Sequence, residues 1–288
     1  MASAPSEAVW RPSELELGRR ATRRRQSTKS VLIALVSSIV FVVVVGWAIL
    51  SSPGWEDVRR AFFDPEIALA SFPSILAGLW VNIQVLFVAA IAVAILGTTL
   101  AVLRSLRGPV FFPLRALATI YTDLFRGIPL LIVLYLVGFG LPALGVFGRV
   151  PVVLWGTIAI VLTYSAYIAE VLRAGMEAVH PSQRVAARSL GLSHAQTLRI
   201  VVIPQGVRKV VPALMNDFVS LQKDVGLISV LGAVDAVRAA QIASAQAYNF
   251  TPYIVAALLF VAMALPMIRL TDYVSARLAK REQMGGTV

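Results

Sequence analysis

Ionisable and amide side chains stand inside stretches of this sequence that are otherwise apolar. An ionisable group at the centre of a bilayer costs about 2.5–3.5 kcal/mol on insertion scales, so such groups usually face a cavity or a partner. They could pair between helices, or they could line a path or a gate for a polar solute. The candidates are Asn82, Gln84, Arg126, Glu170, Arg173, Asn216, Lys223 and Asp224.

The spacing of the charged candidates indicates how they could pair. Glu170 and Arg173 lie one helical turn apart, so a structural salt bridge is the favoured role, with a part in an inner gate as the alternative. Lys223 and Asp224 are adjacent and would point about 100° apart on a helix, so they would not pair well with each other. We favour a structural role for each, with another span or at a helix break, over a place on the solute path.

The residues that most enzymes and metal sites use are scarce. The chain has no cysteine, which excludes disulfides, thiolate metal sites and cysteine nucleophiles, and its two histidines are His180 and His194. The acidic groups do not cluster with a nucleophile, and the phosphate-binding pattern G-x-x-x-x-G-K-[ST] is absent. We therefore expect no catalytic residue, no metal site and no cofactor bound by this chain, and no hydrolysis of ATP by it.

The composition places the chain among membrane proteins. Hydrophobic residues make up 58% of its 288 residues and charged residues 14%, against about 45–50% and about a quarter in soluble domains. So much apolar surface does not fit in one water-soluble core, which predicts an all-α polytopic membrane protein.

Six apolar stretches predict six crossings. They cover residues 31–50, 75–103, 117–141, 150–171, 210–234 and 252–273. About 20 residues rise roughly 30 Å as a helix, which is enough for one crossing. A cleaved signal peptide is the alternative for 31–50, but that apolar run is longer than usual for one.

The segments between these spans are expected to be less regular. Residues 1–30 predict a disordered basic tail, and residues 276–288 a C-terminal tail. Residues 51–74 predict an external loop with a short interfacial helix, and residues 235–251 a loop with few charges.

The formal net charge of +11 has a topological explanation. Basic residues gather in the N-terminal tail and after the second, fourth and sixth spans, and cytoplasmic loops carry such an excess. This pattern places both termini in the cytoplasm and disfavours nucleic-acid binding. We find no internal repeat, whereas carriers built from inverted halves usually show one.

The charged region at 180–204 predicts a pair of short helices. Pro181 suits a first helical turn, and Gly191 accepts the left-handed dihedral angles of a helix end. Ser193 and Gln196 form the spacing of a capping box, which opens a second helix, and Pro204 marks its end or a kink. The hairpin could merely link two spans, or it could dock into a partner's groove.

The same region resembles the cytoplasmic motif of permease subunits in ATP-binding-cassette (ABC) importers. That motif reads E-A-A, three residues, Gly, nine residues, I-x-L-P. Val185 stands where the motif has Glu, and Val201 and Ile203 are conservative replacements. The positions that the resemblance assigns to coupling with an ATPase are Val185, Ala186, Ala187, Gly191, Leu192, Val201, Ile203 and Pro204.

Four further stretches between about 75 and 280 resemble the polar amino-acid branch of that family, in the same order and spacing. They read "GLWVNIQVLFVAAIAVAILGTTLAVLR", "IYTDLFRGIPLLIVLYLVGFGLP", "YIAEVLRAGMEAV" and "PALMNDFVSLQKDVGLISVLG". Ile128 replaces a Thr of the family pattern and Gly226 replaces a Ser. The basic tail and the first span lie outside this resemblance.

The resemblance implies a type I ABC importer permease fold, with five core transmembrane helices in 75–275 and an extra N-terminal anchor at 31–50. It implies a bacterial cytoplasmic (inner) membrane protein that works by alternating access. Its partners would be a cytoplasmic ABC ATPase dimer, which binds ATP and Mg²⁺ and receives the hairpin 180–204, a second identical or homologous permease subunit and an extracytoplasmic solute-binding protein.

The implied cargo is a polar amino acid. Asn82, Gln84 and Asn216 could then bond the backbone of that amino acid, or bond between helices, and Arg126 could face its carboxylate or extend to the membrane interface. The alternatives are another polar solute, such as an opine or a modified amino acid, and a secondary carrier.

Overall fold

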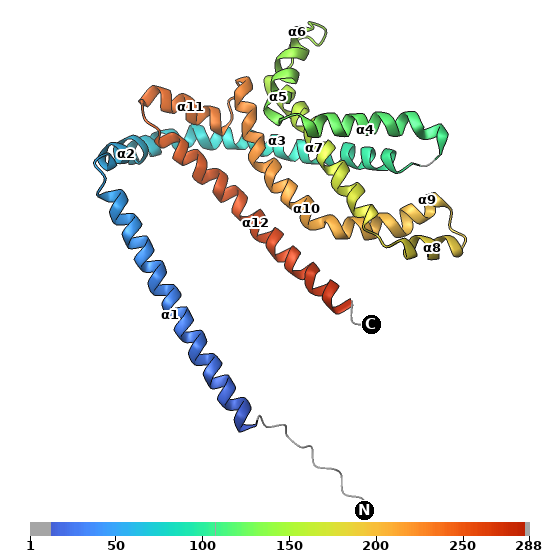
Figure 1. Cartoon of the computed structure of the whole chain (residues 1–288). Helices are drawn as coiled ribbons and strands as arrows, with labels where there is room; N and C mark the ends of the chain where they lie inside the picture. Colours follow the sequence, from blue (N-terminus) through green and yellow to red (C-terminus); the bar gives the residue numbers. More distant parts are fainter. Residues whose placement is uncertain (1–12, 107, 286–288) are drawn as a thin grey trace, which may run out of the picture. The chain divides into compact units, whose positions relative to one another are not determined.

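The computed structural model describes residues 13–106 and 108–285, and every regular element within them is helical (Figure 1). The chain divides into two compact units, residues 1–60 and residues 61–288. The second unit contains all of the candidate functional residues.

The first unit is dominated by one long helix, α1, from Glu14 to Leu50. The side chain of Ser13 caps it by accepting a hydrogen bond from the backbone N–H of Glu16 at 3.3 Å. The prediction of disorder is therefore wrong for residues 14–30, where Leu, Arg and Ala favour helix and extend the span toward the N-terminus. Residues 1–12 lie outside the described part. No described side chain between 31 and 50 is buried, as suits a helix that faces lipid.

The predicted loop at 51–74 contains the short helix that was expected, α2, from Trp55 to Phe62. The next helix, α3, begins at Pro65 and runs to Ser105, ten residues earlier than the second span was predicted to start. Asp64 caps it by accepting from the N–H groups of Glu66 and Ile67 at 2.9 and 3.2 Å. Asp followed by Pro strongly favours the start of a helix, so α3 begins before the apolar stretch from which the span was predicted.

The third predicted span is not one straight helix. Helix α4 covers Phe112–Gly127, after a single 3₁₀ turn η1 at Pro109–Phe111. It is followed by α5 (Leu130–Tyr135), a π-helical turn η2 (Leu136–Gly140) and α6 (Leu141–Ala143). The chain bends by 107° between the two halves. Pro129 causes the break, because it cannot donate a hydrogen bond and holds Ile128 extended.

The fourth span is a single helix, α7, from Val152 to Glu177. The hairpin follows as α8 (Pro181–Ser189) and α9 (His194–Thr197). Pro204 does not end the second helix of the hairpin. The chain continues without interruption through a π-helical turn η3 (Leu198–Val202) into α10 (Ile203–Asp224), whose first turn accommodates the missing N–H of Pro204.

Two further helices replace predicted irregular segments. After a 3₁₀ stretch η4 (Val225–Leu231), helix α11 covers Ala236–Ala247, where a loop was predicted. Asp235 caps α11 by accepting from Arg238 N at 2.9 Å. Helix α12 runs from Thr251 to Gly285, so the predicted C-terminal tail is helical up to residue 285. Residues 286–288 lie outside the described part.

Length and composition allow four straight membrane spans within residues 13–106 and 108–285, or six when each bent pair of helices counts as one. The bent pairs are Pro109–Gly127 with Leu130–Ala143, and His194–Leu231 with Ala236–Ala247. The six predicted crossings agree with the larger count.

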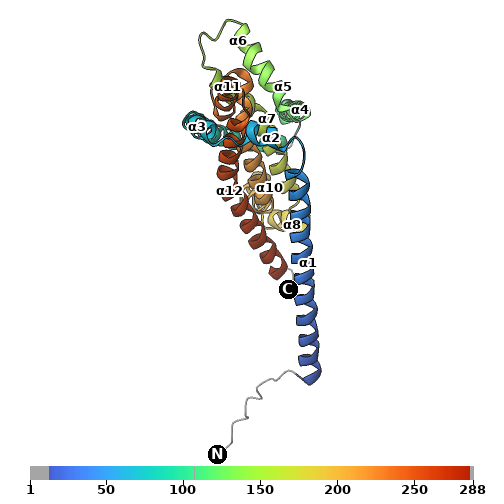
Figure 2. The ribbon, with the colours of Figure 1, turned by 90° about the vertical axis from the view of Figure 1, so that its left-hand side faces the viewer.

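Helix α3 packs along α7, α11 and α12, and α10 lies beside α7 and α12 (Figures 1 and 2). Glycines allow the closest approaches. A Cβ on Gly78 of α3 would lie 2.4 Å from the carbonyl carbon of Asp235, and one on Gly206 of α10 would lie 2.9 Å from the carbonyl oxygen of Gly175 in α7. Small residues at helix contacts are the usual way to pack helices in membranes. The hairpin lies at the opposite end of α10 from α11 (Figure 1).

Candidate functional site

The turn of the α8–α9 hairpin is built by local hydrogen bonds. Gly191 has φ +82°, and its N–H donates to the carbonyl of Arg188 at 3.0 Å. Ser193 accepts from Gln196 N at 3.3 Å, while the Gln196 side chain accepts from Ser193 N at 2.8 Å. The left-handed glycine and the capping box predicted from the sequence are both confirmed.

The hairpin leaves several apolar side chains uncovered. Val185, Leu190 and Ile200 are 64%, 83% and 60% exposed. Of the positions assigned to coupling, Val185, Ala186, Gly191 and Pro204 are exposed, Leu192, Val201 and Ile203 are half-buried, and Ala187 is buried. Exposed apolar side chains beside charged ones suit contact with another protein. Their role in coupling stays a prediction.

Glu170 is the centre of an ion cluster that joins three helices. Arg173 of α7 donates to it through Nη2 at 2.6 Å and Nε at 3.1 Å, and Arg104 of α3 donates through Nη1 at 2.7 Å. Arg126 of α4 places Nη1 3.6 Å from the same carboxylate, and Arg173 also contacts Glu177. The predicted Glu170–Arg173 pair is confirmed. The bond with Arg104, 66 residues away, was missed because no local spacing indicates it.

Asn82 and Asp235 form a buried junction between α3 and the start of α11, and both are 0% exposed. The amide Nδ2 of Asn82 donates to Asp235 Oδ2 at 2.9 Å and to the carbonyl of Val225 at 3.2 Å. Its Oδ1 accepts from Ala236 N at 3.0 Å. The geometry therefore gives Asn82 the interhelical role, whereas Gln84 is exposed on another face of α3.

The remaining polar candidates lie on α10. Asp224 accepts a hydrogen bond from the hydroxyl of Tyr164 in α7 at 2.7 Å. Lys223 and Asn216 are exposed, seven residues apart on the same side of the helix. Within residues 13–106 and 108–285, no ion pair joins Lys223 to Asp224, in agreement with their spacing.

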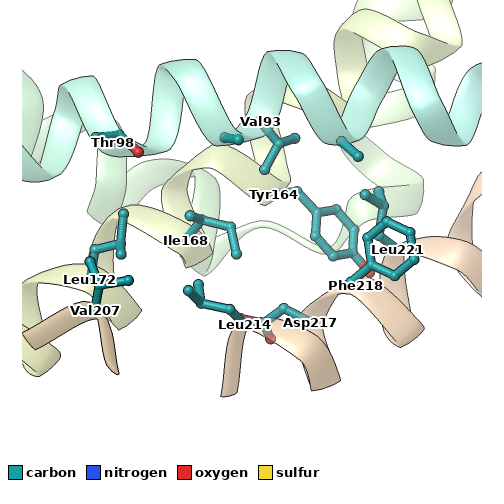
Figure 3. A pocket seen from close by; sticks show the side chains of 12 residues that line it. Val93, Thr98, Tyr164, Ile168, Leu172, Val207, Leu214, Asp217, Phe218 and Leu221 are labelled. Atoms are coloured by element: carbon teal, nitrogen blue, oxygen red, sulfur yellow. The ribbon is translucent and has the colours of Figure 1, made fainter. Parts of the chain in front are cut away.

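A cavity of about 320 Å³ lies between α3, α7 and α10 (Figure 3). Its wall is mostly apolar, and Asp217 is the one carboxylate in it. The lining residues are Ala90, Val93, Ala94, Thr98, Tyr164, Ile168, Leu172, Val207, Leu214, Asp217, Phe218 and Leu221. Oδ2 of Asp217 is buried and has no hydrogen-bond partner in the described part of the chain.

Neither this cavity nor a role for Asp217 was predicted from the sequence. A signal was present, because Asp217 shares a helical face with Leu214, Phe218 and Leu221. An acid in an apolar stripe of a membrane helix is by default a candidate functional residue.

Comparisons with known proteins agree on one family. The family described as "Binding-protein-dependent transport system inner membrane component" matches residues 109–280. The arginine transport system permease protein ArtQ of Bacillus subtilis is 32% identical over 203 residues, which are 70% of this chain and 91% of that protein. The probable glutamine ABC transporter permease protein GlnM of Bacillus subtilis is 35% identical over 187 residues, 65% of this chain and 84% of that protein.

Solved structures of ABC transporters are similar to this chain in fold. A crystal structure described as an amino acid ABC transporter with histidines superposes with a TM-score of 0.65 and 34% identity, covering 71% of this chain and 94% of that chain. An inward-facing MetNI methionine ABC transporter, at 18% identity and a TM-score of 0.57, supports the fold alone.

Proposed function

Because the chain belongs to the family of binding-protein-dependent transport system inner membrane components and is the permease subunit of an ABC importer, we propose that it carries polar amino acids across the bacterial cytoplasmic membrane. The observation that carries this cargo assignment is the cavity between α3, α7 and α10. Its volume of about 320 Å³ suits a small solute, and its apolar wall contains a single carboxylate, Asp217.

Asp217 supplies the recognition of charge. A buried carboxylate oxygen without a hydrogen-bond partner in the described residues is costly, and an ammonium or guanidinium group of the solute would satisfy it. The aliphatic part of the solute would contact Val93, Leu214 and Leu221. The named relatives, an arginine permease and a probable glutamine permease, support an amino acid as cargo.

The energy for transport comes from a separate subunit in this proposal. The sequence has no phosphate-binding loop, so a cytoplasmic ABC ATPase dimer binds ATP and Mg²⁺. The α8–α9 hairpin docks on that ATPase through its exposed apolar residues Val185 and Leu190. The chain itself holds no cofactor.

Two further partners complete the importer. The exposed polar side chains of Asn216 and Lys223 on α10 would be costly against lipid, and a second permease subunit, identical or homologous, keeps them on a central solute path. An extracytoplasmic binding protein delivers the solute. The excess of Lys and Arg in the N-terminal segment, after α3 and α7 and in the C-terminal part of α12 supports a cytoplasmic location for both termini.

Proteoliposomes that contain the permease, its ATPase and the binding protein test the proposal with radiolabelled arginine, glutamine and histidine. We expect accumulation only with ATP. Asp217→Asn should lower the uptake of a cationic amino acid at least tenfold, since the charge at the cavity is lost, while Asp123→Asn, at an exposed carboxylate outside the cavity, should not.

Two results would contradict the proposal. One is ATP-driven uptake of some other solute with no uptake of any polar amino acid. The other is accumulation by the permease alone under a proton or sodium gradient, which would favour a secondary carrier.

A further inference from the structure

A second pocket, of about 400 Å³, lies inside the hairpin itself, between α8 and the segment α9–η3. It is separate from the cavity that contains Asp217. Its lining consists of Arg184, Arg188, His194, Thr197, Leu198 and Val202.

The two arginines of this pocket bond to backbone carbonyls only. Arg184 donates through Nη2 to the carbonyl of Met176 at 2.6 Å, and Arg188 donates through Nη1 to the carbonyl of Leu192 at 3.3 Å. Neither is ion-paired to a carboxylate in the described part of the chain. The sequence has no Asp or Glu between residues 178 and 216, so the hairpin does not supply its own counter-charge.

A buried hydroxyl in the same pocket is also unsatisfied. Thr197 is 4% exposed, and its Oγ1 has no hydrogen-bond partner among the residues that the structure describes. A hydroxyl can donate to an anion, and guanidinium groups offer paired N–H donors that match a carboxylate or a phosphate. The chemistry of this pocket is therefore that of an oxyanion site.

The surroundings favour an anion that belongs to a protein. Exposed Val185, Leu190 and Ile200 lie on the same hairpin, and a soluble ion would leave this apolar surface uncovered. At position 185, where the resemblance to ABC permeases predicts Glu, this chain has an uncharged residue. If opposite charges meet at this contact, the negative charge must then come from the partner protein.

We infer that this pocket receives a carboxylate side chain of the partner ATPase, so that docking pairs a cationic hairpin with an acidic surface. The inference rests on the proposed function, in which the ATPase docks on α8–α9. Arg188 contributes most to the preference for an acidic partner because it is exposed. Arg184 also holds the hairpin to α7 through Met176.

The test compares two charge reversals on the same hairpin, in the full-length permease in nanodiscs. Arg188→Glu changes the pocket, and Arg199→Glu changes an exposed arginine of η3 that does not line it. Binding of the purified ATPase is measured with both. We expect Arg188→Glu to weaken affinity at least tenfold and Arg199→Glu less than threefold, at unchanged thermal stability. One Asp→Lys or Glu→Lys change on the ATPase should restore binding to the Arg188→Glu permease. The same change should not restore binding to the Arg184→Glu permease, because that variant also loses the bond from Arg184 to the carbonyl of Met176.

The inference is overturned if Arg188→Glu binds the ATPase within threefold of the wild type, or if both reversals weaken binding equally, which indicates a diffuse charge effect. It is also overturned if Arg188→Glu abolishes the binding of inorganic phosphate and leaves ATPase binding intact, since the pocket then holds a soluble anion. Failure of the wild-type permease to bind the ATPase at all is a different result, because it removes the proposed function as well.

Discussion

The junction of α3 with α11 and the hairpin α8–α9 differ in whether their buried polar groups have hydrogen-bond partners. At the junction, Asn82 and Asp235 are fully buried, and the amide of Asn82 bonds to three groups of the same chain. In the hairpin, the hydroxyl of Thr197 is buried without a partner in the described residues, and Val185 and Leu190 are exposed.

This difference separates structural sites from sites of contact. A buried polar network in which every member is bonded stabilises one arrangement of helices. A segment that leaves donors and apolar surface unsatisfied gains free energy only when another molecule covers it. Changes at the junction should therefore lower stability, and changes in the hairpin should affect the partner.

The largest expected effect is at the junction. Asn82→Leu removes the bonds to Asp235, Ala236 and Val225 and leaves buried polar groups without partners, each of which costs about 1–3 kcal/mol. We expect the free energy of unfolding to fall by about 3 kcal/mol, measured by thermal or denaturant unfolding in detergent.

The matched control is Gln84→Leu, two residues further along α3 at an exposed position. It should leave stability unchanged. Equal loss in both variants would show that the Asn82 network contributes nothing specific.

A smaller effect is expected at Glu170, where the ion cluster is half-buried. The side chains of Glu170 and Arg104 are 20% and 12% exposed, so Glu170→Gln leaves Arg104 and Arg173 close together without their counter-charge. We expect a loss of about 2 kcal/mol, between the values for exposed and buried ion pairs. Unfolding experiments should show it, and Asp272→Asn, at an exposed pair with Arg269, should cost far less. A Glu170→Gln variant as stable as the wild type would contradict a structural role for the cluster.

The smallest effect on stability is expected at Gly191, in the hairpin. A Cβ there meets no atom within 4 Å, so Gly191→Val suffers only from its φ of +82°, at about 1–2 kcal/mol. The strained turn should misplace α8 against α9, so ATP hydrolysis by the partner continues while solute uptake falls several-fold. Gly191→Asn, which tolerates this backbone conformation, should retain uptake. Normal uptake by the valine variant would contradict the coupling role of the hairpin.

The features that local residue order determines were predictable. Pro181, Gly191 and the Ser193–Gln196 box define the hairpin within a few residues each, and the structure has all three. Helix α11 was missed because its twelve residues are too few for a membrane span, and its start depends on Asp235, whose other oxygen bonds to Asn82 on a distant helix.

Contacts between segments far apart in the sequence could not be predicted from local sequence patterns. Arg104 and Glu170 come from different helices, and the cavity around Asp217 exists only because α3, α7 and α10 pack together. The pattern around Asn82 allowed two roles, and only the position of Asp235 decides between them. The third span was predicted as one crossing, and the 107° bend at Pro129 depends on tertiary packing.

The unbroken path from α9 through η3 into α10 has a mechanical consequence. Thr197 in the hairpin and Asp217 at the cavity are twenty residues apart on one helical segment, or about 30 Å at 1.5 Å per residue. No loop between them can absorb a displacement. An axial shift of the hairpin end would therefore carry the acidic wall of the cavity with it. In the proposed importer, the geometry around a bound solute would then depend on the nucleotide state of an ATPase that makes no contact with that solute.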